Sequence, residues 1–435
     1  PFYYGWVVLV ASTVGIVMSA PGQTIGVSVF TESLLGATGL SRVEFSNAYL
    51  AGTLMSGLLL PRAGRWIDRV GARRGVIVAS VGLGLVLAYL SQVDRIAARV
   101  AEAGLPAMPT AWAFLVLGFL GLRFSGQGLL TLVSRTMLGR WFERRRGLVS
   151  SLSGPFSSFA FASSPIVLAG WVAGSGWRAA WLEMAVTVGV GMAFLGWLFY
   201  RETPEACGLE IDGGPAPAAT EDAIGSAKVR PLRPSRDFTR AEALRTAAFW
   251  IVTLGIGNHA MVGTGMALHI VDLGAEAGLS EADSLGLFLP ITFISIPTGI
   301  LIGMAVDRFP MRFLIMGMMV GQTLMFGLAP HLGDPLLHAL CLAGWGFSGG
   351  FYGPLTVAAL PNFFGRTHLG AIQGVMMMVI VIASALGPAL LAAVKDVFGS
   401  YAPGLHALAF LPLGIFLIAP FTRDPQAASS TIGPS

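Results

Sequence analysis

Charged residues are scarce in this sequence, and the few that occur are clustered. Asp, Glu, Lys and Arg make up 11% of the 435 residues, against about 25% in an ordinary soluble domain. Long stretches such as 1–31 and 335–365 contain none of them. Because a helix needs about 20 apolar residues to cross a bilayer, this composition excludes a soluble enzyme, a nucleic-acid-binding protein and a disordered scaffold. It predicts a protein that crosses the membrane many times.

Other absences narrow the function further. The two cysteines, Cys207 and Cys341, are too few and too far apart for a disulfide framework or a thiolate metal site. The six histidines show no metal-ligand spacing, and no G-x-x-x-x-G-K-[ST] phosphate loop is present, so ATP is not expected to drive the protein directly. The sequence also has no nucleophile constellation and no continuous polar pore. We therefore predict neither an enzyme nor a channel, and no metal or cofactor.

Twelve apolar segments predict an all-α membrane protein with two six-helix bundles. The predicted spans lie near residues 4–29, 45–63, 75–93, 111–139, 147–172, 178–200, 247–270, 284–306, 313–330, 335–360, 368–394 and 401–422. The predicted domains are an N-terminal bundle (1–201), a cytoplasmic linker (202–245), a C-terminal bundle (246–422) and a cytoplasmic tail (423–435). The linker contains a stretch rich in Gly, Pro and Ala that predicts flexibility. Its end, 238–249, favours a short amphipathic helix on the membrane surface.

The distribution of Lys and Arg predicts the orientation. If both ends face the cytoplasm, 21 of the 27 basic residues lie in cytoplasmic loops, 5 lie outside and Arg123 lies within the membrane. Such a bias follows the positive-inside rule. We therefore expect a multi-pass protein of the cell (inner) membrane, in contact with the lipid bilayer, with both termini in the cytoplasm.

The two halves of the chain are related copies. A shift of 239 residues places Gly39-Leu-Ser41 on Gly278-Leu-Ser280, and the same shift places Gly64 on Gly303 and Asp68 on Asp307. A shift of 223 residues places 124–126 (Phe-Ser-Gly) on 347–349, and Gly147 on Gly370. Parallel repeats joined by a linker are one of the designs by which a carrier rocks two bundles around a central site.

A motif between the second and third spans carries a family resemblance. Residues 64–74, Gly-Arg-Trp-Ile-Asp-Arg-Val-Gly-Ala-Arg-Arg, match the G-x-x-x-D-R-x-G-x-R-[RK] signature of the major facilitator superfamily, and 201–208 (Arg-Glu-Thr-Pro-Glu-Ala-Cys-Gly) is also typical of it. The resemblance covers essentially the whole chain. It implies two bundles that alternate in access, with this cluster latching them together on the cytoplasmic side. The expected latch residues are Gly64, Asp68, Arg69, Arg73, Asp307 and Arg308.

The physical properties of these residues suit such a latch. Gly64 lets two helices touch, and Asp68 can cap the N-terminus of a neighbouring helix and interact with its dipole. Arg69 and Arg73 are expected to pair with Asp68. The alternative is a loop whose basic residues only set the orientation.

Arg123 is the one charged residue near the middle of the fourth span, where a cation costs at least about 2.5 kcal/mol. Its repeat partner is Gly346, so the fold itself does not require a charge there. Together with Gln127 it resembles the second motif of the superfamily, with one extra residue between Arg and Gln. The resemblance implies that this span lines the central cavity. Arg123 is then an anion clamp or part of a proton relay; the alternative is a structural arginine bound to carbonyl groups and Gln127.

Further polar residues within the spans are candidate substrate contacts. Gln23 and Thr24 follow Pro21-Gly22, which predicts a break in the first span, tolerated where the chain lines a cavity. Tyr352 offers a hydroxyl and an apolar ring, and Asn258 lies beside His259. Together with Arg123 and Gln127, these five residues are the predicted substrate-binding residues.

Two histidines of the seventh span are candidates for proton coupling, because histidine titrates near physiological pH. These are His259 and His269; an interhelical hydrogen bond is the alternative role for each. Glu183 in the sixth span is expected to be structural or to lie at an interface.

The predicted function is secondary active transport of a small solute, with protons as a further partner. One central arginine with few membrane acids favours a small organic anion, and Tyr3-Tyr-Gly-Trp6 resembles the start of bacterial monocarboxylate and oxalate/formate carriers. Those carriers commonly have an arginine in the eighth span, and 286–306 has none, so Arg123 takes over the anion or the substrate is not a carboxylate. The alternative is an exporter of drugs or neutral metabolites. Substrate identity, direction, coupling ion and oligomeric state stay open.

Overall fold

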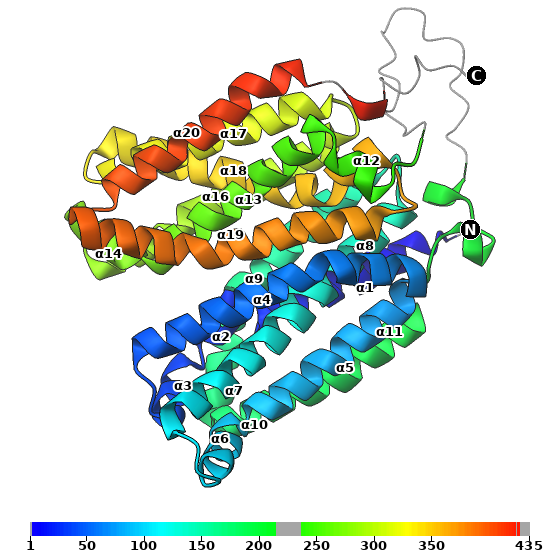
Figure 1. Cartoon of the computed structure of the whole chain (residues 1–435). Coiled ribbons are helices and arrows are strands. Elements are labelled where there is room, and N and C mark those ends of the chain that lie inside the picture. Colours follow the sequence, from blue (N-terminus) through cyan, green and yellow to red (C-terminus); the bar gives the residue numbers. More distant parts are fainter. Residues whose placement is uncertain (1, 215–235, 423, 427–435) are drawn as a thin grey trace, which may run out of the picture.

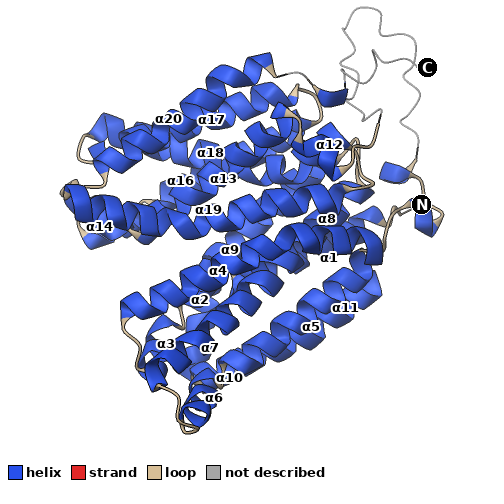
Figure 2. Ribbon diagram, viewed as in Figure 1, coloured by secondary structure: helices blue, strands red, loops and turns tan. Residues whose placement is uncertain are grey.

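The computed structural model describes residues 2–214, 236–422 and 424–426. These residues form helices joined by turns and loops, with no strand in the described ranges (Figure 2). The central part of the linker and most of the tail lie outside the described residues. Two groups of helices lie next to each other, one from each half of the chain (Figure 1).

The N-terminal bundle holds the first six spans. Its helices are α1 (Gly5–Val17), α2 (Thr24–Ser28), α3 (Thr31–Thr38), α4 (Arg42–Val70), α5 (Ala72–Leu90), α6 (Val93–Ala101), α7 (Ala107–Leu122), α8 (Thr131–Trp141), α9 (Arg146–Ser175), α10 (Trp177–Val186) and α11 (Ala193–Phe199). Two π-helical segments, η2 (Arg123–Leu130) and η3 (Thr187–Met192), connect α7 with α8 and α10 with α11.

The C-terminal bundle holds the last six spans. Its helices are α13 (Ala247–Leu268), α14 (Ile270–Glu276), α15 (Glu281–Gly286), α16 (Phe288–Val306), α17 (Met311–Leu328), α18 (Pro335–Phe364), α19 (Leu369–Phe398) and α20 (Ala402–Ile418). Ten segments of the described chain are long and apolar enough to cross a membrane. With α4 and α18, which have 29 and 30 residues and pack along their neighbours, the fold has twelve transmembrane helices in two pseudo-symmetric bundles.

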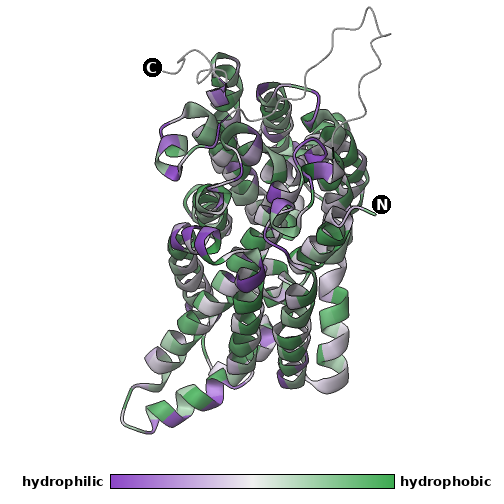
Figure 3. Ribbon diagram, turned by 90° about the vertical axis from the view of Figure 1, so that its right-hand side faces the viewer, coloured by the Kyte–Doolittle hydropathy of each residue, from purple (hydrophilic) through white to green (hydrophobic). Residues whose placement is uncertain are grey.

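The hydropathy of the helices agrees with a lipid environment. Hydrophobic residues predominate along them, and hydrophilic ones are prominent toward the end that carries the termini (Figure 3). Many large apolar side chains are exposed; Ile166 is 77% exposed and Phe293 71%. Exposed apolar area on this scale marks a surface that contacts something other than water. In a polytopic membrane protein this is the surface that faces lipid.

The repeated Gly-Leu-Ser motif has the same structural role in both halves. Gly39 and Gly278 have φ values of +70° and +80°, which glycine adopts without steric cost. Ser41 and Ser280 then cap the following helices, accepting hydrogen bonds from the Glu44 and Asp283 amides. The repeat in the sequence is therefore a turn and an N-cap that start the second span of each bundle.

The first span is broken at the predicted place. α1 ends at Val17, a short 3-10 turn spans Ala20–Gly22, and α2 resumes at Thr24. Pro21 lies inside that turn. The break leaves the carbonyl of Gly22 free of helical hydrogen bonding and available to side chains of the fourth span.

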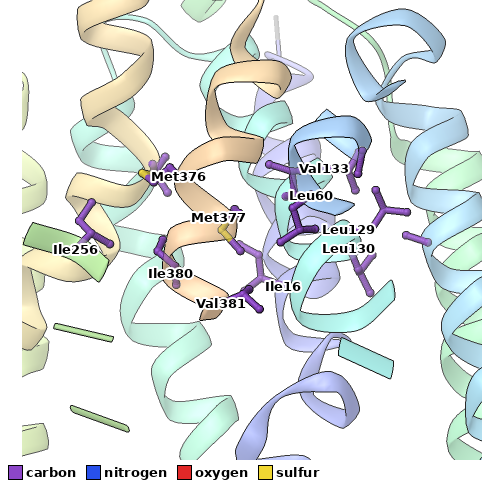
Figure 4. Packing of buried hydrophobic residues seen from close by; sticks show 14 of the residues in the cluster. Ile16, Leu60, Leu129, Leu130, Val133, Ile256, Met376, Met377, Ile380 and Val381 are labelled. Atoms are coloured by element: carbon purple, nitrogen blue, oxygen red, sulfur yellow. The ribbon is translucent and has the colours of Figure 1, made fainter. Parts of the chain in front are cut away.

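Contacts between the bundles concentrate near the end that carries the linker. There α4 packs on α19, and α9 packs on α16. Figure 4 shows the apolar part of this interface, where Met377 and Val381 of α19 point toward Ile16 and Leu60 of the N-terminal bundle. The two bundles diverge toward the opposite end (Figure 1).

The described N-terminal end of the linker is held to the N-terminal bundle by hydrogen bonds. Glu202 accepts hydrogen bonds from the Ala72 and Arg73 amides at 2.6 and 3.2 Å. Asp212, only 4% exposed, accepts one from the Arg144 amide at 2.8 Å. The prediction of flexibility is therefore wrong at Asp212, because these carboxylates cap backbone groups; the stretch 215–235 lies outside the described residues.

The predicted amphipathic helix before the seventh span is much shorter than expected. α12 covers only Arg240–Leu244, and α13 already begins at Ala247. A capping box between Thr239 and Glu242 starts α12, and Phe238 packs against Phe364 of α18. The segment 238–249 is thus a brief helical turn against the C-terminal bundle, followed by the first turn of α13.

Candidate functional site

Asp68 connects the two bundles at the linker end. Its carboxylate accepts hydrogen bonds from the Gly370 and Ala371 amides at 2.9 and 2.7 Å, at the start of α19. Arg140 of α8 pairs with it at 2.6 Å, and both side chains are largely buried. A carboxylate at a helix N-terminus interacts favourably with the unpaired amides and the helix dipole. We call this set the Asp68 contact.

Asp307 makes the equivalent contact in the second half. It accepts hydrogen bonds from the Gly147 amide at 2.9 and 3.1 Å, at the start of α9. Among the described residues, no cation lies within ion-pair distance of this carboxylate. Burial raises the pKa of Asp307 to about 6, although the Gly147 amide and the nearby Arg146 act in the opposite direction. We call this set the Asp307 contact.

Small residues let the helices approach closely at both contacts. A Cβ on Gly64 would lie 2.0 Å from the Gly370 carbonyl oxygen, and one on Gly147 would lie 1.7 Å from the Gly303 carbonyl oxygen. Both distances are far below van der Waals contact, so neither position accepts a larger residue without separation of the helices. The repeated glycines of the sequence are therefore points of backbone contact between the bundles.

The predicted pairing of Asp68 with Arg69 and Arg73 is wrong. Arg69 is exposed and forms no ion pair among the described residues, and the same holds for Arg308, the latch arginine predicted in the second half. Arg73 points back to its own bundle, where its Nε donates to the Trp197 carbonyl at 2.8 Å and its guanidinium lies over the Trp197 ring. Arg140 takes the place at Asp68 because the fourth span ends beside α4, a proximity that loop spacing does not reveal.

Arg123 lies inside the N-terminal bundle with 0% of its surface exposed. Its Nη1 donates to the Gly22 carbonyl at 3.0 Å and lies 3.4 Å from Thr24 Oγ1. The guanidinium lies 5.3 Å from the centroid of the Tyr49 ring, whose hydroxyl donates to Thr24. Nε and Nη2 of Arg123 have no hydrogen-bond partner. The break in the first span thus supplies the carbonyl and hydroxyl partners of Nη1, while Nε and Nη2 are left without a hydrogen-bond partner.

The other predicted residues of this bundle lie nearby. Gln23 donates to Ser19 Oγ at 3.0 Å, and Thr131 donates to the same oxygen at 3.1 Å. Gln127, 9% exposed, has an unpartnered Oε1. Arg123, Gln127, Gln23 and Thr24 therefore lie in one polar layer between α1, α2 and η2, and none of them lines the cavity between the bundles; their role in substrate binding stays a prediction.

The predicted residues of the C-terminal bundle lie in three separate places. His259 and Tyr352 are neighbours, with ring centroids 5.4 Å apart, and His259 Nδ1 has no partner. Asn258 instead donates to Gln322 of α17 at 3.1 Å, within its own bundle. His269 is hydrogen-bonded to the Pro388 carbonyl at 3.1 Å, away from this pair. Glu183 is exposed on α10.

A cavity of about 140 Å³ lies between the bundles. Its walls come from α9, α16 and α18, with Arg135 of α8 as the charged residue among its lining side chains. Arg135 lies 6.0 Å from the Tyr352 ring centroid, and its Nη1 lies 3.8 Å from Met377 Sδ. Serines of α9 contribute hydroxyls, and Ser157 Oγ is buried without a partner. The described lining contains no carboxylate.

Arg135 is not among the predicted site residues, although the predicted fourth span, 111–139, contains it. The structure places it inside α8, half-buried and facing the opposite bundle. One signal was available: Arg123, Gln127, Thr131 and Arg135 recur every four residues, which places them on one side of a helix. A continuous polar stripe along an otherwise apolar span indicates a side that faces the interior of the protein.

These features define a membrane transporter in which two helix bundles enclose a central cavity. The family model described as Major Facilitator Superfamily matches residues 8–430. The chain therefore belongs to the major facilitator superfamily, and it is a multi-pass membrane protein.

Individual relatives are distant. Monocarboxylate transporter 11 from Mus musculus is 26% identical over 367 residues, which cover 72% of this chain and 78% of the relative. The E. coli fucose:proton symporter has a TM-score of 0.65 at 13% identity, covering 97% of this chain and 99% of the other. The human organic anion transporter MFSD10 has the same TM-score, identity and coverages. These structural similarities confirm the fold.

Proposed function

We propose that the protein is a secondary active transporter of a small organic anion of the monocarboxylate type. Transport occurs by alternating access, either with a proton or in exchange for another solute. Support comes from positive charge within the membrane that has no counter-charge. Among the described residues, neither Arg123 nor Arg135 takes part in an ion pair; their contacts are a carbonyl, a hydroxyl, two rings and a thioether.

An uncompensated cation inside a membrane protein is costly, and such residues mark ion and substrate pathways. A structural ion pair would lower this cost by placing an acid beside the arginine. The chain instead leaves two nitrogens of Arg123 without partners and surrounds Arg135 with hydroxyls and apolar groups. An anionic substrate supplies the missing charge. A monocarboxylate carrier among the relatives agrees with this choice.

The Asp68 and Asp307 contacts act as the conformational latch of the proposed cycle. Both hold the linker end closed while the bundles diverge at the other end. With the orientation predicted from the basic residues, this is the outward-facing form. The latch has to open before substrate reaches the cytoplasm, and the aspartates then exchange helix amides for water.

His259 is the proposed site of proton coupling. Its Nδ1 has no partner, and its ring lies beside Tyr352, which lines the cavity. A proton taken up there adds positive charge close to the anion. His269 is a weaker candidate, because its ring nitrogen already has the Pro388 carbonyl as a partner.

The test is thermal stabilisation of the purified protein by small carboxylates, sugars, amino acids and cationic drugs. A ligand at one hundred times its Kd adds about 2.7 kcal/mol to the free energy of unfolding. We expect the shift with carboxylates alone, and loss of anion uptake in Arg123→Gln at unchanged thermal stability. Stabilisation only by bulky apolar compounds would instead identify an exporter of drugs or neutral metabolites.

A further inference from the structure

The two membrane arginines are too far apart to bind the same carboxylate. They are separated by 12 residues along the fourth span, which corresponds to about 18 Å of helix. Arg123 is enclosed in the N-terminal bundle, whereas Arg135 lines the cavity between the bundles. A small anion held in this conformation therefore contacts one of them, and the cavity belongs to Arg135.

We propose that Arg135 is the residue that selects the substrate, at a site closed by Ser157 and Tyr352, and that the ligand is a compact monoanion with one carboxylate and a short apolar body. This proposal rests on the proposed function and assigns its binding site. Three observations carry it: the charge of the cavity wall, the unpartnered hydroxyl beside it, and the volume of the cavity.

The charge of the wall limits the ligand to a single negative charge. Arg135 is the one charged side chain among the described lining residues, and no described acid neutralises it. A guanidinium suits a carboxylate through two parallel hydrogen bonds. A dicarboxylate would leave its second charge against Ile296, Val357 and the Tyr352 ring, without a cation.

The hydroxyls show that the wall is built for a polar group. Ser157 is 8% exposed, lines the cavity, and its Oγ has no hydrogen-bond partner. A buried hydroxyl without a partner costs free energy unless a ligand satisfies it. Ser153 Oγ lies on the same wall and is hydrogen-bonded to Thr13 Oγ1 at 2.9 Å, so Ser157 is the buried hydroxyl of this wall that lacks a partner.

The space limits the size of the body. A cavity of about 140 Å³ is close in size to the roughly 150 Å³ cavity that holds benzene in an engineered protein core. Phe161, Pro354 and Tyr352 provide apolar walls for such a body. Ligands with the size of acetate, pyruvate or benzoate match this volume, and a two-ring carboxylate exceeds it.

The test compares monocarboxylate binding to the purified full-length protein and to single variants, with acetate, pyruvate, benzoate and 2-naphthoate as probes. We expect Arg135→Gln to weaken binding of the best monocarboxylate at least tenfold, with a smaller loss in Arg123→Gln. Ser157→Ala should weaken binding several-fold. Arg99→Gln removes an exposed arginine outside the membrane and should leave binding unchanged. The two-ring acid should not bind the wild-type protein.

The outcomes separate this proposal from the proposed function. A larger loss in Arg123→Gln than in Arg135→Gln would overturn the assignment and leave anion transport standing. Binding of 2-naphthoate as tight as benzoate would overturn the size limit. If no carboxylate binds the wild-type protein, the proposed function itself fails.

A second measurement covers the case in which Arg135→Gln does not fold. Ser157→Cys is made with Cys207→Ser, because Cys207 is exposed whereas Cys341 is buried. A small anionic thiol reagent should label position 157, and benzoate should slow labelling at least threefold. Labelling that is unaffected by a bound monocarboxylate would overturn the proposal.

Discussion

The Asp68 and Asp307 contacts have equivalent geometry in the two halves of the chain, but only the Asp68 contact contains a cation. Each aspartate receives backbone N–H groups at the start of a long helix of the other bundle. Only Asp68 has a cation, Arg140, at 2.6 Å. The shift that places Gly147 on Gly370 places Arg140 on Phe363, so the second copy has an aromatic ring where the first has a charge.

The comparison shows that geometry and charge compensation are separable. An aspartate, two glycines and a helix N-terminus suffice for the contact, because they appear in both halves. Burial raises the pKa of both aspartates, and Arg140 opposes this rise only at Asp68. The pKa of Asp307, which has no ion pair among the described residues, is raised to about 6, within the range that cells experience.

The same asymmetry extends along the whole fourth span. Arg123, Arg135 and Arg140 all lie in the N-terminal bundle, and the shift of 223 residues places them on Gly346, Ala358 and Phe363. The described C-terminal bundle contributes His259 and Tyr352 on its side of the interface. Within the transmembrane part of the interface, the N-terminal bundle therefore supplies the fixed positive charge, and the C-terminal bundle supplies the titratable and aromatic groups. At the linker end, Arg366 of the C-terminal half also reaches across and donates to the Arg140 carbonyl at 2.8 Å.

The largest expected effect comes from removing the close backbone approach at the Asp68 contact. In Gly64→Ala the new Cβ lies 2.0 Å from the Gly370 carbonyl oxygen. Because this oxygen belongs to the backbone, a change of side-chain rotamer cannot relieve the clash, and the two helices have to separate. We expect the linker end to stay open. The measurement is labelling of a cysteine at Ser151, which is 5% exposed at the contact of α9 with α16, in the Cys207→Ser background.

That labelling should rise at least tenfold in Gly64→Ala when reagent is added from the linker side. Gly154→Ala is the matched control, because nothing lies within 4 Å of its Cβ position. Equal labelling in the two variants would show that the bundles are not held by this backbone contact.

The second-largest expected effect distinguishes the Asp68 contact from the Asp307 contact. Asp68→Asn leaves Arg140 buried without its partner, and breaking a buried pair in this way costs about 3 kcal/mol. Asp307→Asn breaks no ion pair among the described residues and should cost less. We expect the fraction of the linker-closed form, followed by the same Ser151 cysteine, to fall much further in Asp68→Asn. Similar accessibility in both variants would refute a role for Arg140.

The smallest effect is the pH response of the second copy. Because the pKa of Asp307 is raised in the closed form, protonation favours that form over one in which the carboxylate contacts water. The stabilisation is present at low pH and is lost as pH rises through about 6. Labelling at Ser151→Cys, with rates corrected for the pH dependence of thiol reactivity, should therefore increase between pH 5 and pH 7. Asp307→Asn should reduce this increase, and the remainder belongs to other groups such as Asp68, whose pKa burial also raises. A pH response unchanged in Asp307→Asn would refute the assignment to Asp307.

Part of this picture follows from the sequence alone. Low charge and long apolar runs specify the spans, because no water is available inside a bilayer to satisfy a free backbone. The repeated Gly64 and Asp68 pattern predicts a carboxylate at a helix N-terminus, and Pro21-Gly22 predicts a broken first span. These features are local, or are copied between the halves, so spacing along the chain reveals them.

The rest was decided by the tertiary structure. The sequence suggested Arg69 and Arg73 as partners of Asp68, because they are near in the chain, but the packing of α8 beside α4 brings Arg140 instead. The sequence did not mark Arg135 as a site residue, but the continuation of η2 into α8 carries it to the cavity wall. Which residues meet across an interface depends on how helices rotate and pack, and no spacing in one helix records the face of another.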